Sequence, residues 1–131
     1  MKRLGLFVIA IAALSACTDD DDGGGDCTGS VLGCTWAELS AAQEMEACDL
    51  ITASIDDGAG TKYECTEGPN AGLSLTVDSA STCVARSYPA GCPVTVQQTL
   101  DCFKAAKTNA CSAFDDAGAC GRLFASAAQC Q

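Results

Sequence analysis

The spacing of the cysteines constrains this chain more than any other feature. Eleven cysteines occur in 131 residues, and ten of them fall between residues 27 and 130 with no two closer than seven positions. An even number at this density is typical of a small exported domain that is held together by disulfide bonds. The ten cysteines are Cys27, Cys34, Cys48, Cys65, Cys83, Cys92, Cys102, Cys111, Cys120 and Cys130.

A metal or redox site is the alternative use of so many thiols. Zinc ribbons, iron–sulfur clusters and thioredoxin-like motifs carry a C-x-x-C element, which this sequence lacks. The chain also has no histidine, which excludes His-based catalytic triads and HExxH metal sites. We therefore expect no metal and no cofactor, and we expect all ten cysteines to form disulfides whose pairing the sequence leaves open.

The apolar composition favours the same framework. Hydrophobic residues make up 48% of the chain, but aromatic residues make up only 5%. A small domain with so few large side chains builds a thin core. Each disulfide contributes roughly 2–4 kcal/mol, so five of them would supply a large share of the stability.

Residues 1–16 form a predicted signal segment. The positively charged Lys2-Arg3 precedes an apolar run from Leu4 to Leu14, which is too short to cross a bilayer as a helix. The run ends in Leu14-Ser15-Ala16-Cys17, so we predict cleavage between Ala16 and Cys17. An ordinary secretory signal with a chance cysteine at the cleavage site is the alternative.

This segment resembles the lipobox of bacterial lipoprotein precursors, and the resemblance covers residues 1–17. In that family the thiol of the cysteine at the position of Cys17 receives diacylglycerol, and the new amino group is usually acylated. The resemblance therefore implies a stable membrane anchor, because two or more acyl chains hold a protein at a bilayer. The residue after Cys17 is Thr18 and not aspartate, which in this family favours the outer membrane.

Residues 17–26 are predicted to form a disordered tether between the anchor and a folded domain of residues 27–131. Positions 18–26 contain five aspartates and three glycines, and their carboxylates repel one another. A calcium site on Asp19–Asp22 is the alternative, but consecutive aspartates on an unstructured segment cannot preorganise a cage. Positions 27–131 carry five basic and twelve acidic residues, a formal charge of −7 that argues against nucleic acid.

The folded domain is predicted to be mainly α-helical with one β-hairpin, an α+β arrangement. Thr35 followed by Glu38 resembles a capping box and predicts a helix over 35–50. Strands are predicted over 62–66 and 73–77, since apolar and polar residues alternate in the second and a glycine-rich turn precedes it.

From residue 79 the cysteines recur every nine or ten positions, which predicts three short helical units. Thr95 with Gln98 predicts the start of the second unit. In the third, a continuous helix would place Cys120 and Cys130 about 15 Å apart, so they would have to bond to other elements. The residues expected to face inward are Val96, Leu100, Phe103, Leu123 and Phe124.

This C-terminal half is similar to the cysteine-rich lipoproteins of myxobacteria and related predatory bacteria. The similarity lies in Thr95-Val96 at a helix start and in the spacing of Cys102, Cys111, Cys120 and Cys130. It covers residues 79–130 loosely. What it implies is a cell-envelope setting, and it implies no activity.

The sequence holds no catalytic motif. Serine nucleophile motifs, P-loops and dinucleotide fingerprints are missing. Asp56-Asp57 and Asp115-Asp116 are paired carboxylates, but they adjoin glycine turns and are typical of solvated loop tips. Trp36, Tyr63 and Tyr88 could form a stacking surface, although in a domain with few aromatics they are more often part of the core.

We therefore expect a lipid-anchored surface module that binds an envelope protein or glycan or is structural, and not an enzyme. The alternative is a small enzyme or protease inhibitor displayed at the cell surface. With the inward faces used for packing, recognition is expected in loops 55–60, 67–72 and 115–118, whose acidic character suits a basic or glycan-bearing partner. The oligomeric state stays open.

Overall fold

The computed structural model describes residues 27–84 and 87–130, so the predicted signal segment, Cys17 and the tether lie outside the described residues. The described part is about half helical with one two-stranded antiparallel sheet, which confirms the predicted α+β class. Its elements are the 3₁₀ turns η1 (Val31–Gly33) and η2 (Trp36–Glu38), the helices α1 (Ala41–Ile55), α2 (Ala80–Val84), α3 (Val96–Thr108), α4 (Ala110–Phe114) and α5 (Ala119–Ala127), and the strands β1 (Lys62–Glu64) and β2 (Ser74–Thr76).

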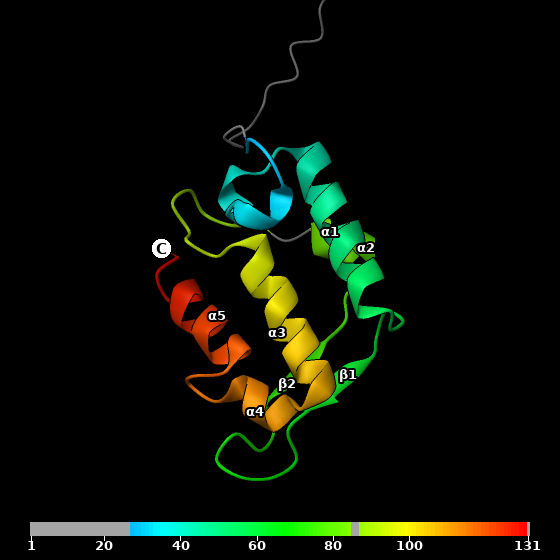
Figure 1. Ribbon diagram of the computed structural model, residues 1–131, viewed down its shortest axis with the longest axis vertical. Helices are drawn as coiled ribbons and strands as arrows, with labels where there is room; N and C mark the ends of the chain where they lie inside the picture. Colours follow the sequence, from blue (N-terminus) through cyan, green and yellow to red (C-terminus); the bar gives the residue numbers. More distant parts are fainter. Residues whose placement is uncertain (1–26, 85–86, 131) are drawn as a thin grey trace, which may run out of the picture.

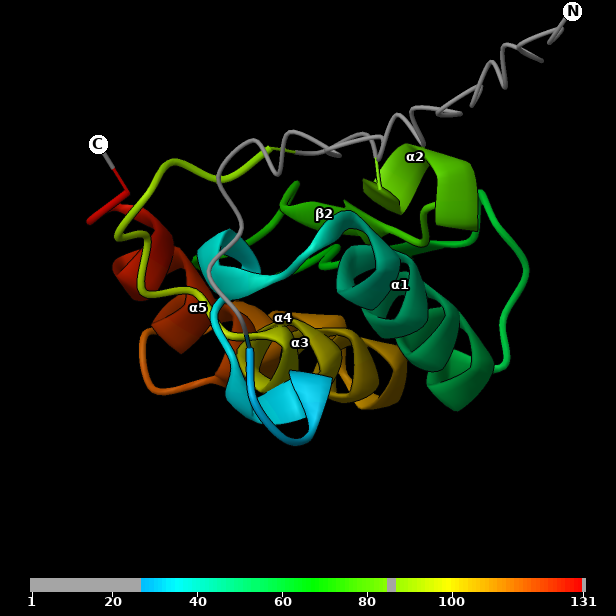
Figure 2. The ribbon, with the colours of Figure 1, turned by 90° about the horizontal axis from the view of Figure 1, so that it is seen from above.

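Helix α3 lies at the centre of the fold, with α1 on one side of it and α5 on the other (Figure 1). The hairpin and α2 cover one face of these helices, as the view from above shows (Figure 2). The N-terminal 3₁₀ turns are tied to the start of α3 by a bridge between Thr35 and Thr95. In this bridge the Trp36 N–H donates to the Val94 carbonyl at 2.9 Å.

Helix α1 begins and ends later than predicted. The capping box at Thr35 exists, and the Thr35 N–H donates to Glu38 at 2.9 Å, but it closes only the short turn η2. The chain is extended at Leu39, and a second box begins α1, in which the Ser40 N–H donates to Gln43 at 3.0 Å. The predicted helix over 35–50 is therefore wrong at both ends. It begins only after the box at Ser40, and it continues to Ile55 because no residue breaks it before Asp56, which takes a left-handed conformation.

The hairpin is confirmed, with shorter strands than predicted. Tyr63 pairs with Leu75, and the pairing extends one residue to either side. Val77, just beyond β2, is buried, and Leu75 is half-buried. Leu73 was expected to share their face but is 45% exposed, because it precedes the paired residues and bonds back to the Asn70 carbonyl.

All ten cysteines of the domain lie in disulfide pairs, as predicted. The Cα atoms of each pair are 4.4–5.9 Å apart, within the ordinary range. Cys120 and Cys130 bond to different partners, which confirms the expectation from the helical rise. The pairs are Cys27–Cys34, Cys48–Cys83, Cys65–Cys111, Cys92–Cys130 and Cys102–Cys120.

The core is built from branched aliphatic side chains and from sulfur. Within the described residues no polar or charged residue is buried. Val96, Leu100 and Phe103 face inward as predicted. The core has two clusters of buried residues, one that includes Trp36 and one that includes Phe114, and the half-buried Leu123 packs against both. Phe124 was also expected to face inward, but this prediction is wrong. Its side chain is 45% exposed and stacks on the outer side of Phe114, with 6.1 Å between the ring centroids.

Close contact between α5 and the turn that follows α4 predicts an unusual response to alanine substitution. A Cβ atom on Gly121 would lie 2.1 Å from the Asp115 carbonyl oxygen. Gly121→Ala should therefore lower the free energy of unfolding by about 1–3 kcal/mol through overpacking, although alanine is the better helix former. Urea denaturation with the disulfides intact measures this.

Gly58→Ala is the matched control, because a Cβ there meets no atom within 4 Å. If the two variants are equally stable, this close contact is contradicted.

Candidate functional site

Two of the three predicted recognition loops meet at one end of the molecule. The Asn70 side-chain amide, in the loop between β1 and β2, donates to Asp115 Oδ1 at 2.8 Å. The Cys65–Cys111 disulfide holds the base of the same loop against α4. Loop 67–72 and loop 115–118 therefore form one surface, which we call the acidic loop end. The third loop, 55–60, lies at the other end of the hairpin, where the Gly60 N–H donates to the Val77 carbonyl.

The loop between the strands is braced by its own backbone. The Cys65 N–H donates to the Leu73 carbonyl at 3.0 Å, and the Gly72 N–H donates to the Cys65 carbonyl at 2.8 Å. A further turn joins Ala71 to the Gly68 carbonyl at 3.2 Å. A loop held in this way loses little conformational freedom when a partner binds to it.

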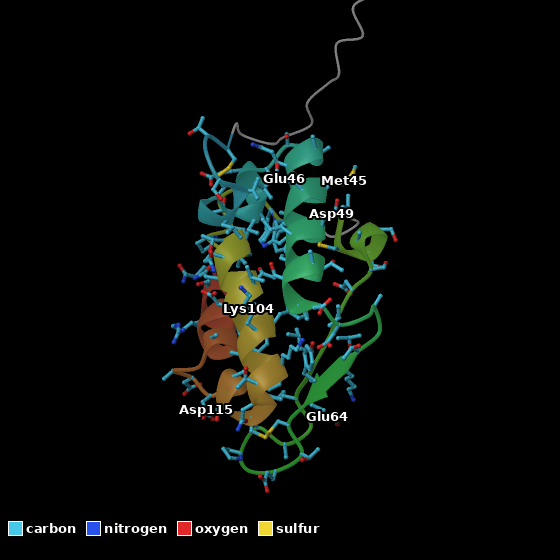
Figure 3. The ribbon with its side chains drawn as sticks, turned by 45° about the vertical axis from the view of Figure 1, so that its right-hand side comes forward. Met45, Glu46, Asp49, Glu64, Lys104 and Asp115 are labelled. Carbon is cyan, nitrogen blue, oxygen red and sulfur yellow. A yellow bond between two sulfur atoms is a disulfide. The ribbon has the colours of Figure 1, made fainter. Side chains whose placement is uncertain are left out.

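The acidic loop end is hollowed and negatively charged. A shallow hollow of about 390 Å³ lies between the loop and α4, with Glu67 and Asp115 among its lining residues. Figure 3 places Asp115 near α4 and Glu64 on β1 at this same end of the molecule. Glu67 and Asp115 are the acidic residues among those that line the hollow, whereas Glu64 pairs with Lys62 at 2.8 Å.

A separate polar junction joins α1, β1 and α3. The Tyr63 hydroxyl donates to the Asp57 carboxylate, which also lies 3.3 Å from Lys107 Nζ. The same nitrogen donates to the Ile55 carbonyl at 2.5 Å, at the C-terminal end of α1. Nothing in the sequence pattern indicated this junction, because Lys107 is fifty residues from its acidic partner in an unrelated helix.

The electrostatics of the junction indicate a structural role. The hydrogen bond from Tyr63 lowers the pKa of Asp57. Burial, followed by the bond to Asp57 and the charge of that carboxylate, raises the pKa of Tyr63 to about 12. The phenol therefore stays protonated as the donor to Asp57, and the contacts of Tyr63, Asp57 and Lys107 fasten the ends of the helices to the hairpin.

Asp56 and Asp57 do not converge with each other. Asp56 caps the end of α1, whereas Asp57 points to Tyr63. Residues 27–84 and 87–130 contain no cluster of three or more cysteine or acidic side chains that could hold a metal ion.

Trp36 belongs to the core, as expected, and is 4% exposed. Its indole stacks on Tyr88 with a centroid distance of 5.4 Å, and its N–H donates to Thr99 Oγ1 at 2.9 Å. The pair is therefore not an open stacking surface for a sugar. Phe103 was expected to be used entirely in packing, but it also lines a small cavity together with Val77, so that expectation is wrong.

Comparisons with known proteins leave the function open. No protein-family model matches the chain, and no match was found among the curated proteins or the solved structures. Across the part of the chain that the structure describes, no helix is both long and apolar enough to cross a bilayer.

The junction predicts a pH dependence of stability. Because the pKa of Tyr63 is about 12 in the folded chain and near 10 when unfolded, its contribution is present below pH 10 and is lost as the pH rises towards 12. Tyr63→Phe should lower the free energy of unfolding at pH 7 by about 1 kcal/mol and should flatten this alkaline loss.

Urea denaturation of both proteins between pH 7 and the alkaline limit of the disulfides measures the effect. The other titrating groups are common to both proteins, so the difference between the two curves isolates Tyr63. Parallel curves would contradict a raised pKa of Tyr63 in the folded chain, and coincident curves would show that the hydroxyl contributes nothing.

Proposed function

We propose that this chain is a lipid-anchored binding module of the bacterial cell envelope, with its recognition surface at the acidic loop end. The observation that carries the proposal is that the start of the domain and the acidic loop end lie at opposite ends of the molecule. The described chain begins at the top of Figure 1, and the loop between β1 and β2 lies at the opposite end. A lipid on Cys17 would therefore attach at one end of the domain and leave the other end free for a partner.

The disulfides support a location in the cell envelope. Five buried or partly buried bridges form and persist in oxidising compartments and are rare in the cytosol. Cleavage after Ala16 and acylation of Cys17 would anchor the chain by more than one acyl chain. Thr18 after the cysteine favours the outer membrane within the lipoprotein family.

The charge of the domain supports a position away from the bilayer. Residues 27–131 carry a formal charge of −7, and an anionic lipid surface repels them. The ten residues of the tether can reach about 33 Å when extended. Only the Cys17 anchor then lies in the membrane.

The partner suited to the acidic loop end is basic, either a protein or a glycan that carries amino groups. Complementary charge increases the rate of encounter and selects against acidic partners. The braced loop adds to affinity, because little freedom is lost when it binds.

Anchoring is tested by Cys17→Ser. The wild-type chain should carry acyl groups by intact mass and enter the detergent phase, whereas the variant should stay unlipidated, either as an uncut precursor or as a soluble product. Thr18→Ser, which leaves the residues up to Cys17 unchanged, is the control and should behave as wild type. Identical partitioning of wild type and Cys17→Ser would refute the anchor.

Recognition is tested with an oligolysine peptide as a cationic probe. Glu67→Gln with Asp115→Asn should weaken its binding by about fivefold at low salt, since two exposed charges are removed. The control is Glu46→Gln with Asp49→Asn on α1, two charges that Figure 3 places well away from Asp115. Calorimetry at low and high salt measures both, and equal losses in the two variants would contradict a site at the acidic loop end.

A further inference from the structure

A small cavity lies in the body of the domain, distinct from the acidic loop end. It is lined by residues of α1, α2 and α3, by Trp36 of η2, by Tyr88 and by the chain that follows β2, and it measures about 40 Å³. A cavity needs only about 10–15 Å³ to admit one water molecule, so this one has room for a group of several atoms. Its floor is apolar and buried, and is formed by Trp36, Ile51, Ile55, Val77 and Phe103.

The rim of the cavity is polar and offers acceptors. The Thr52 hydroxyl donates to the Cys48 carbonyl at 2.9 Å, and the Thr99 hydroxyl donates to the Thr95 carbonyl at 3.3 Å. Both hydroxyl protons are therefore engaged within the protein. Thr99 Oγ1 also accepts the Trp36 N–H and so retains one further lone pair as an acceptor. Asp78, which is half-buried and has contacts of its own within the protein, also lines the cavity.

This combination selects the chemistry of a ligand. An apolar floor gains from a hydrocarbon body, and a rim of acceptors needs a ligand that donates hydrogen bonds. The net charge of the domain favours a cation and repels an anion, and Asp78 is the acidic residue among those that line the cavity. A carboxylate accepts several hydrogen bonds, so Asp78 can receive an ammonium group in addition to its contacts within the protein.

We infer that this cavity binds a small primary amine, with its alkyl body on the apolar floor and its ammonium group at Asp78. The size limits the ligand to about four carbon atoms. The inference does not depend on the proposed lipid anchor or on the acidic loop end, because the cavity uses none of their residues.

Trp36 provides the readout. It is the single tryptophan of the chain and it lines the cavity, so its fluorescence reports occupancy directly. The soluble product of the Cys17→Ser variant is purified without detergent and titrated with isobutylammonium. The neutral probe of the same shape is isobutanol, and the anionic probe is isovalerate.

We expect a saturable change in Trp36 emission with isobutylammonium and a dissociation constant on the order of 1 mM, as is ordinary for so few atoms. Isobutanol should bind about tenfold more weakly, and isovalerate should give no saturable response.

Two variants test separately the contribution of the Asp78 charge and that of the cavity volume. Asp78→Asn should weaken isobutylammonium binding by about tenfold and leave isobutanol binding unchanged. Val77→Ile adds one methylene group to the floor and should abolish binding of both. Asp116→Asn makes the same change of charge outside the cavity and should bind as wild type.

Urea denaturation verifies that each variant is folded. Equal affinity for the amine and the alcohol would overturn the role of Asp78. An unchanged titration in folded Val77→Ile, or no saturable response of the wild-type chain, would overturn the site itself.

Discussion

The rest of the structure depends on the Cys102–Cys120 disulfide, which lies fully buried between α3 and α5. A helix of nine residues such as α5 is too short to be stable alone, so it needs a covalent or packed partner. Around this bridge the core consists largely of alanine and of the Cys65 sulfur, with Phe114 as its large side chain. Here sulfur occupies the volume that leucine or phenylalanine fills in larger domains, and it also removes freedom from the unfolded chain.

Polar contacts then fix the ends of the elements that the disulfides bring together. No charged side chain is buried in the described domain, so the ionic groups work at its periphery. Lys107 donates to the Ile55 carbonyl at the C-terminal end of α1 and pairs with Asp57. A cation stabilises a helix most at this end, where the helix dipole is negative. The junction with Tyr63 thereby sets the position of the hairpin, and the hairpin in turn carries the acidic loop end.

Local signals in the sequence predicted local structure, and they failed where two signals competed. The capping box at Thr95 predicted the start of α3 correctly. The box at Thr35 closes only the 3₁₀ turn η2, and a second box at Ser40, two residues beyond that turn, begins α1. The outward position of Phe124 could not be foreseen, because it depends on which face of α5 the bridge to α3 occupies. Disulfide pairing and the Tyr63 junction join residues far apart in the chain, and a single sequence carries no signal for such contacts.

The persistence of the cavity follows from the same covalent framework. At about 24 cal/mol per Å³, a void of 40 Å³ costs on the order of 1 kcal/mol. The Cys48–Cys83 bridge, which joins α1 to α2 at the rim, contributes roughly 2–4 kcal/mol. Because the stabilisation by the disulfide exceeds the cost of the cavity, α2 can be held in a position that does not fill the cavity. A domain stapled in this way can therefore keep an open apolar site that a domain held by packing alone would tend to fill.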